Sequence, residues 1–404
     1  MESVALALPV LLAIMALEFY FSKKRGKKYF SFPDTISNLS IGIIDRLCSL
    51  LFAGFFYFVY QYLQTHFAIL VIKPTALNWL IMFMLVDFLW YWYHRASHEV
   101  NIFWAQHVVH HSSKEFNYIV GARVTILQSF VRLLFWCILP VIGFTAPMIV
   151  LMLLIHAVYQ FFTHTQMVGK LGFLEYFLVT PSHHRVHHGS NEKYLDKNYG
   201  GFFIVWDRLF GTFAEEKEQV KFGLTKPLTS RSLIWQIFHV WVELYAAVKL
   251  EKRWVNKLKI LFGKPDLINP NIRKKAEKFF LTKKIKGKIS DLFKQYIVYQ
   301  MAFSLLALIL LLYFSQALKI WETYAIVTGI VLTLINCGAI MEQRKWVFHL
   351  EFARFVLIIL AAGCYNVQWI APGVIVLCVF LIYYSSLQRF YFSRYLAPSP
   401  INSI

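Results

Sequence analysis

Long segments without charged residues constrain this chain more than any other feature of its sequence. Several runs of about 17–25 residues are nearly uncharged, which is long enough for a helix to cross roughly 30 Å of hydrocarbon. Hydrophobic residues make up 58% of the chain and aromatic residues 18%, a composition too apolar for a soluble protein. The sequence therefore predicts an all-α, polytopic helical membrane protein with a polar lobe.

The apolar segments also predict how the chain is divided. Eight of them are expected to enter the membrane: 4–21, 41–63, 78–93, 125–163, 297–317, 322–340, 347–364 and 369–385. The segment 125–163 is interrupted by Pro140, Gly143 and Pro147, so it forms either two spans or a re-entrant helical hairpin. We expect four parts: N-terminal transmembrane helices at 1–70, a catalytic core at 71–225, a basic cytoplasmic segment at 226–295, and C-terminal transmembrane helices at 296–404.

The net charge of +19 comes largely from Lys and Arg residues beside the apolar runs. Lys23, Lys24 and Arg25 follow the first span, which predicts that its C-terminal end lies in the cytoplasm. The lysine-rich stretch 249–288 is either an amphipathic surface helix or a solvated loop, and we favour contact with lipid headgroups. No nucleic-acid partner is expected, because that function needs a basic face on a soluble fold.

The five cysteines all lie in apolar segments and form no CxxC pair. Neither a disulfide framework nor a zinc–thiolate site is therefore indicated.

Three histidine clusters between residues 94 and 188 hold nine of the 14 histidines. Spacings of three and four residues place the members of a cluster on one side of a helix. If the spans alternate in direction, all three clusters lie on the cytoplasmic face. The clusters are His94 and His98; His107, His110 and His111; and His183, His184, His187 and His188.

So many imidazoles predict a metal site. Two or three such helix faces would supply about eight nitrogen ligands, more than one ion needs, which favours two metals. Asp87 lies two turns before His94 and is expected to hydrogen-bond the second nitrogen of a ligand imidazole, while Glu99 would orient a ligand or bind solvent. Imidazole suits zinc, copper, iron and nickel alike, so ligand type alone leaves the metal open.

Other site classes fit less well. A zinc peptidase needs His-Glu-x-x-His, but Arg95 follows His94 and no Glu lies inside a cluster. A metal transporter should carry ionisable residues in the middle of its spans, whereas these clusters follow span ends. A pH-sensing cluster, a proton relay and adventitious metal binding remain as alternatives.

The clusters and the residues around them resemble the three histidine boxes of the membrane fatty acid hydroxylase/sterol desaturase superfamily. The stretches 92–99, 104–113 and 180–189 are similar to the boxes of its alkylglycerol monooxygenase branch, as are 159–165 and 196–213. The resemblance covers about residues 80–225 in its core and extends to the layout of the late apolar segments.

This resemblance implies a di-iron monooxygenase that inserts oxygen from O2 into a C–H bond of a lipid. Beside an ether oxygen, the product would be a hemiacetal that breaks into an aldehyde and a glycerol lipid. The alternative is a sterol or fatty-acyl hydroxylase or desaturase using the same two Fe ions. The chain carries no flavin, heme or dinucleotide motif, so the electron donor would be external, and the alkylglycerol branch implies tetrahydrobiopterin.

By the same resemblance, the clusters supply the iron ligands. His164 would be a further ligand, His183 either a ligand or a neighbour that supports one, and His156 a weaker candidate. Asn198 and Tyr199 would line the site or cap a turn. The resulting metal set is His94, His98, His107, His110, His111, His164, His183, His184, His187 and His188, with Asp87, Glu99 and Asn198 as candidate catalytic residues.

Overall fold

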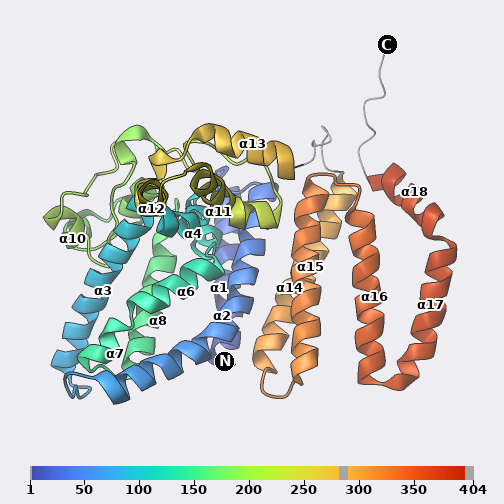
Figure 1. The fold of residues 1–404 in the computed structure, drawn as a ribbon, viewed down its shortest axis with the longest axis horizontal. Coiled ribbons are helices and arrows are strands. Elements are labelled where there is room, and N and C mark those ends of the chain that lie inside the picture. The colour runs from blue at the N-terminus through green and yellow to red at the C-terminus, as the bar shows by residue number, and fades with distance from the viewer. Residues whose placement is uncertain (1, 282–289, 396–404) are drawn as a thin grey trace, which may run out of the picture. The chain divides into compact units, whose positions relative to one another are not determined.

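The computed structural model describes residues 2–281 and 290–395, and these residues form helices with two isolated β-bridges. The chain divides into two compact units (Figure 1). One comprises Leu11–Thr229 and Ile237–Phe279, and the other comprises the described residues of Met1–Val10, Ser230–Gln236 and Phe280–Ile404. The expected all-α fold is confirmed.

Four long helices form the frame of the first unit. They are α1 (Glu2–Lys24), which belongs to this unit from Leu11 onward, α2 (Phe32–Phe67), α3 (Ala76–Glu99) and α8 (Ala146–Thr163). Ser31 and Thr75 start α2 and α3 by accepting the backbone N–H of the third residue along, which satisfies a donor that the helix cannot use. α2 bends by 47° between Ser49 and Gly54.

The segment 125–163 folds as two short helices and one long helix. α6 (Ile126–Phe135) and α7 (Ile138–Ile142) precede Gly143, and α8 begins three residues later. Gly143 has a φ of +128°, and a Cβ there would lie 2.1 Å from the carbonyl oxygen of Leu70, so only glycine fits this approach of two backbones. The apolar residues of α2, α3, α6, α7 and α8 pack into one core. Within this segment α8 is long and apolar enough to cross a membrane, whereas Leu127–Ile142 is a shorter apolar stretch.

Short elements form a polar lobe at one end of α3 and α8 (Figure 1). They are α4 (Asn101–His111), α5 (Tyr118–Gly121), η1 (Gly172–Tyr176), α9 (Pro181–His187), η2 (Glu192–Tyr194) and α10 (Val205–Leu209). The C-terminal half of α1 is tied to this end, because Glu18 accepts hydrogen bonds from the Tyr118 N–H and the Thr165 hydroxyl.

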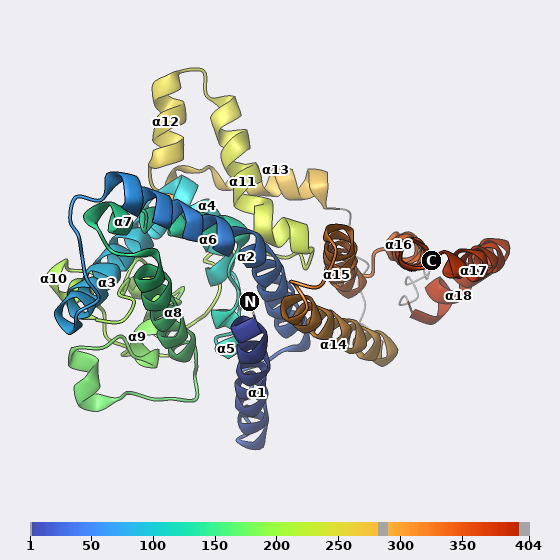
Figure 2. The ribbon, with the colours of Figure 1, turned by 90° about the horizontal axis from the view of Figure 1, so that it is seen from below.

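The segment after the lobe contains α11 (Leu233–Leu250), α12 (Trp254–Phe262), η3 (Pro265–Leu267) and α13 (Pro270–Phe280). Figure 1 shows α11 and α12 nearly end-on while α3 and α8 run up the picture, and Figure 2 shows α11 and α12 along their length. They therefore run across the direction of α3 and α8. An apolar helix such as α11 was not expected in this basic segment, and residues 282–289 of the lysine-rich stretch lie outside the described residues.

The second unit is built from α14 (Asp291–Tyr313), α15 (Ile320–Met341), α16 (Val347–Tyr365), η4 (Val367–Trp369), α17 (Ile370–Ile382) and α18 (Tyr384–Tyr395). Across the described residues of both units, seven helices are long and apolar enough to cross a membrane: α1, α3, α8, α11, α14, α15 and α16. Two bent pairs also pass by composition, one within α2 and one at η4–α17 with α18. The chain is a multi-pass membrane protein, as its sequence predicts.

Candidate metal centre

Nine buried histidines form two neighbouring groups inside the polar lobe. In each group, one ring nitrogen from every member lies within 4.8 Å of the others. The groups adjoin, because the rings of His111 and His188 stack with centroids 4.3 Å apart. The five-histidine group is His94, His98, His107, His111 and His187, and the four-histidine group is His110, His164, His184 and His188.

Helix geometry explains how neighbouring histidines reach different groups. His107 and His111 are four residues apart on α4 and join the same group, whereas His110 joins the other. On α9 the pair His184 and His188 likewise belongs to one group and His187 to the other. A helix advances 100° per residue, so positions i+3 and i+4 fall on opposite sides of position i. α4 and α9 therefore each lie between the two groups and serve both.

Backbone carbonyls fix the orientation of four rings. Each ring donates its Nδ1–H to one carbonyl oxygen. The pairs are His94 with Tyr199 at 2.8 Å, His187 with Lys197 at 3.0 Å, His110 with Arg123 at 3.2 Å and His164 with Gln160 at 2.7 Å. A proton held on Nδ1 leaves the Nε2 lone pair free as a ligand and sets the direction in which it points.

The ring nitrogens approach one another in a way that calls for a cation. The Nε2 atoms of His110 and His164 lie 3.1 Å apart although both rings carry their proton on Nδ1, so two lone pairs face each other. Burial lowers the pKa of His164 to about 4, and burial and the neighbouring His164 lower the pKa of His110 well below its usual value. Both shifts favour neutral rings, and a bound metal ion would remove the repulsion between the two lone pairs.

Three further nitrogens support the same conclusion. The Nε2 atoms of His98, His187 and His188 are buried and have no hydrogen-bond partner among the described residues. A buried polar atom without a partner costs about 1–3 kcal/mol. Metal ligation satisfies all three atoms, so the residues present fit two bound metal ions.

Two of the candidate histidines lie outside both groups. His183 points away from its neighbour His184: its Nδ1 is 3.3 Å from the Thr180 N–H at the start of α9 and 3.2 Å from the Leu178 carbonyl. His156 instead hydrogen-bonds Asp87, with its Nε2 2.9 Å from the carboxylate. The structure thus brings His164 to the metal groups and leaves His183 and His156 in supporting positions.

Asp87 does not make the contact that the sequence predicts. His94 has given its Nδ1–H to Tyr199, and the Asp87 carboxylate accepts instead from His156, from the N–H groups of Phe202 and Phe203 and from the Trp206 indole. Asp87 is therefore a buried anchor for the loop that follows Tyr199.

A second buried carboxylate holds the other end of this loop. Asp207 accepts the N–H groups of Tyr199 and Gly200, both at 2.7 Å, and the Thr212 hydroxyl. Burial raises the pKa of Asp207 to about 6. Together with Asp87, it fixes the backbone that presents the Tyr199 carbonyl to His94.

Asn198 and Glu99 also lie beside the ligands and not among them. The Asn198 amide donates to the carbonyls of His183 and Ala214 and accepts the Ala214 N–H, which holds the residue at a φ of +56°. Glu99 pairs with Arg95 at 2.9 Å and lines a pocket. Of the two roles predicted for Asn198, it therefore has the second, which is to stabilise a turn. This turn carries the Tyr199 and Lys197 carbonyls that hold His94 and His187.

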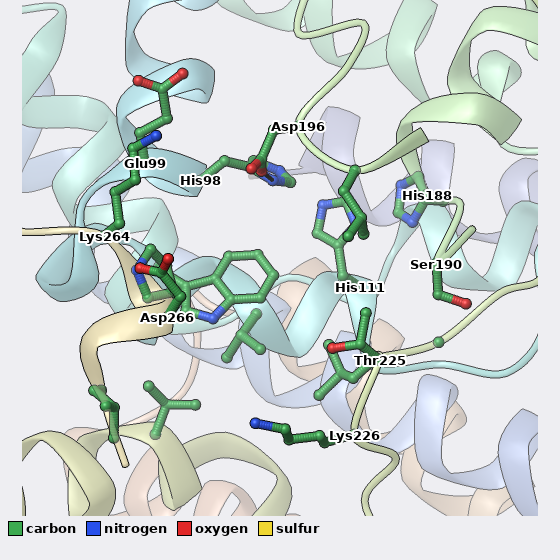
Figure 3. Close-up of a pocket in the computed structure, with 18 of the residues that line it drawn as sticks. His98, Glu99, His111, His188, Ser190, Asp196, Thr225, Lys226, Lys264 and Asp266 are labelled. Carbon is green, nitrogen blue, oxygen red and sulfur yellow. Dashed lines mark ion pairs between the residues drawn. The ribbon is translucent and has the colours of Figure 1, made fainter. Parts of the chain in front are cut away.

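The pocket beside the five-histidine group has a volume of about 490 Å³. Figure 3 shows His98, Asp196, His111 and His188 along its upper part, with Asp266 and Lys226 below them. Trp104 stands against His98 and His111, with ring centroids 5.3 and 5.9 Å away, and gives the wall an apolar surface. The pocket therefore opens onto His98, His111 and His187 of the five-histidine group and onto His188 of the four-histidine group.

Comparisons with known proteins agree with the site. Residues 79–212 match the family described as fatty acid hydroxylase. Over 368 residues, the chain is 33% identical to alkylglycerol monooxygenase of Homo sapiens, covering 88% of this chain and 81% of that protein. It is 37% identical over 242 residues to alkylglycerol monooxygenase of Xenopus tropicalis, covering 57% of this chain and 52% of that protein.

A bacterial relative is more distant. Ornithine lipid hydroxylase of Rhizobium tropici is 28% identical over 141 residues, or 35% of this chain and 43% of that protein. No solved structure matches the chain.

Proposed function

The chain belongs to the alkylglycerol monooxygenase family of membrane lipid monooxygenases, and from this premise we propose that it is a di-iron enzyme that cleaves the O-alkyl bond of alkylglycerol ether lipids. The observation that carries the proposal is the pair of adjoining groups of five and four histidines. Their ring nitrogens point toward one another, and between the Nε2 atoms of His110 and His164 there is no proton to share. One group per ion accounts for all nine rings.

The proposed iron pair would supply activation of O2 for insertion of one oxygen atom at the carbon beside the ether oxygen. The resulting hemiacetal breaks into an aldehyde and a glycerol lipid. Oxidation of a C–H bond by O2 needs a redox-active ion, which excludes zinc. Iron is proposed over copper on the family resemblance alone.

The residues of this chain would hold and shield that centre. The carbonyls of Tyr199, Lys197, Arg123 and Gln160 keep four rings in the orientation that ligation needs. Trp104 and the buried position of every ligand keep bulk water away from the reacting carbon. The electrons would come from an external donor, which we propose is tetrahydrobiopterin.

We propose that the histidine groups face the cytoplasm. Glu18 ties the end of α1 to the lobe, and the run from Lys23 to Lys28 that follows this end contains five basic residues. Basic residues are retained on the cytoplasmic side of membrane proteins.

Metal analysis of the purified enzyme combined with a product assay tests the function. We expect two irons per chain and aldehyde release from 1-O-alkylglycerol that requires O2 and reduced pterin. Iron with no ether cleavage, but with hydroxylation or desaturation of an acyl chain or sterol, would move the enzyme to the alternative substrate class. Absence of bound transition metal would overturn the di-iron proposal itself.

A further inference from the structure

The α11–α12 hairpin exposes large apolar side chains on both of its helices. On α12, Trp254 is 76% exposed, Val255 62%, Leu258 50% and Phe262 58%, and none of its residues is fully buried. A surface helix of a soluble protein shows the opposite pattern. Exposure of these side chains indicates that the medium outside α12 is apolar.

α11 carries the same pattern. From Ile237 onward, where α11 belongs to the first unit, Phe238 and Tyr245 lie on its outer side and are 41% and 67% exposed, whereas the polar Glu243 is buried against that unit. Arg273 of α13 pairs with Glu243 at 2.7 Å, so the charge on the inner side is neutralised. An outward apolar surface therefore continues from α11 into α12.

The direction of the hairpin limits what this medium is. α11 and α12 run across α3 and α8, two helices that are long and apolar enough to cross a membrane, so a bilayer crossed by α3 and α8 would lie parallel to both helices of the hairpin (Figures 1 and 2). Lys252, Arg253, Lys257, Lys259 and Lys264 add positive charge along α12 and its ends. An apolar face combined with lysines is typical of a helix in the headgroup layer of an anionic leaflet.

The hairpin also forms part of the pocket beside the histidines. Val240 and Glu243 of α11 and Lys264 after α12 line it. Asn101 at the start of α4 fixes the end of α12, because its backbone N–H donates to the Gly263 carbonyl and its amide donates to the carbonyls of Ile260 and Lys264. The outer surface of the hairpin and the wall of the pocket thus belong to one rigidly attached element.

We propose that α11 and α12 form an in-plane hairpin in the headgroup layer, on the membrane face that carries the histidine groups, and that a lipid passes from that leaflet into the pocket along it. The in-plane position is independent of the reaction. Entry of the lipid along the hairpin rests on the proposed function. It means that the substrate comes from the membrane leaflet and not from the aqueous phase.

Depth measurements with spin labels test the position without any turnover. Single cysteines replace Phe238, Leu250, Val255 or Leu258 in a chain whose native cysteines are removed, and the protein is placed in vesicles of phosphatidylcholine and phosphatidylserine. We expect all four labels to collide with O2 more than with a water-soluble nickel chelate, at similar depths. A Lys217→Cys label in the polar lobe, where the side chain is 74% exposed, should show the reverse preference.

Each alternative gives a different result. If α11 crosses the membrane, labels at 238 and 250 differ in depth by about 18 Å, since they are 12 residues apart on a helix that rises 1.5 Å per residue. If α12 faces water, the nickel chelate quenches labels at 255 and 258. If a second copy of the chain covers α12, the spin labels at 255 or 258 on the two copies lie close together, and spin–spin interaction broadens their spectra. Any of the three overturns the in-plane position.

A paired substitution then tests lipid entry. Val255→Asp combined with Leu258→Asp should raise KM for a long-chain substrate in vesicles at least several-fold and leave kcat, iron content and KM for a short-chain soluble substrate unchanged. An unchanged KM in vesicles would overturn entry through the leaflet. Inactivity of the unsubstituted enzyme toward ether lipids would instead reject the proposed function and leave the depth result standing.

Discussion

His183 and His184 are adjacent in sequence but occupy different environments. His184 has its Nε2 3.0 Å from that of His164 within the four-histidine group, whereas His183 sits at the N-terminus of α9 beside Thr180. We expect His184→Ala to bind about half the metal of the unsubstituted chain because one group loses a ligand. His183→Ala should keep full metal and lose about 1 kcal/mol of stability, the usual cost of a helix cap. Elemental analysis and thermal unfolding measure both, and equal metal loss in the two variants would contradict the assignment.

Gly201 lies where the loop after Tyr199 passes His156 and Trp90. A Cβ at this position would lie 2.3 Å from the His156 ring and 2.7 Å from the Trp90 ring, and both side chains are buried. Gly201→Ala should therefore push the loop outward, at a cost of about 1–3 kcal/mol, and weaken the hold of the Tyr199 carbonyl on His94. We expect a lower melting temperature and less bound metal. Gly169→Ala, with no atom within 4 Å of its Cβ, is the matched control and should change neither.

The histidines of the two groups could be predicted from the sequence to a greater extent than the groups that orient their rings. Spacing and resemblance brought all nine grouped histidines into the predicted metal set, to which His183 was added in excess, while the weaker candidate His156 also lies outside the groups. The carbonyls of Lys197, Tyr199, Arg123 and Gln160 could not be found in this way, because every residue type has a carbonyl. Asp87 was found as a buried acid, but its partner depends on where α8 packs, which helix periodicity does not determine.

α3 carries two carboxylates, Asp87 and Glu99, which we expect to contribute very differently to the stability of the fold. Asp87, in its buried middle, anchors α8 through His156 and the loop through Phe202, Phe203 and Trp206, whereas Glu99 at its end forms one part-exposed pair with Arg95. Asp87→Asn turns an acceptor into a partial donor against these N–H groups and should cost about 3 kcal/mol.

Glu99→Gln provides the comparison, because a pair of this exposure is worth less than about 1 kcal/mol. Denaturation in detergent micelles followed by circular dichroism measures both changes. A loss for Glu99→Gln as large as that for Asp87→Asn would mean that Glu99 has a structural role beyond its contact with Arg95.

At the level of whole elements, length and apolarity located most helices because the bilayer requires them. α11 was missed for a physical reason. Its inward side carries Gln236, His239 and Glu243, so the surrounding sequence resembles a polar cytoplasmic segment although the outer side is apolar. The bend in α2 and the break at Gly143 are likewise set by packing of one segment on another and not by local composition.

Across the whole molecule, basic residues are distributed unequally between the two ends of the spans. In the first unit, the connection 68–75 lies at the end of α3 that is remote from the histidines, and it contains one basic residue and no acidic residue. The run 23–28 at the histidine end contains five basic residues. In the second unit, Arg344 and Lys345 follow α15, and the connection 366–369 contains no charge. This asymmetry should place the connections 68–75 and 366–369 on the lumenal or external side.

Glycosylation mapping in a eukaryotic membrane tests this orientation. An Asn-x-Thr acceptor on a flexible spacer, inserted in the connection 68–75 or 366–369, should be glycosylated because it lies in the lumen. The same insert after Arg25 or between Arg344 and Trp346 should remain unmodified, and both control inserts must leave expression unchanged. Modification after Arg25 with none in 68–75 would reverse the first unit and place the histidine groups on the lumenal face. Because the two units are mapped by separate inserts, a reversal in one would not be hidden by the other.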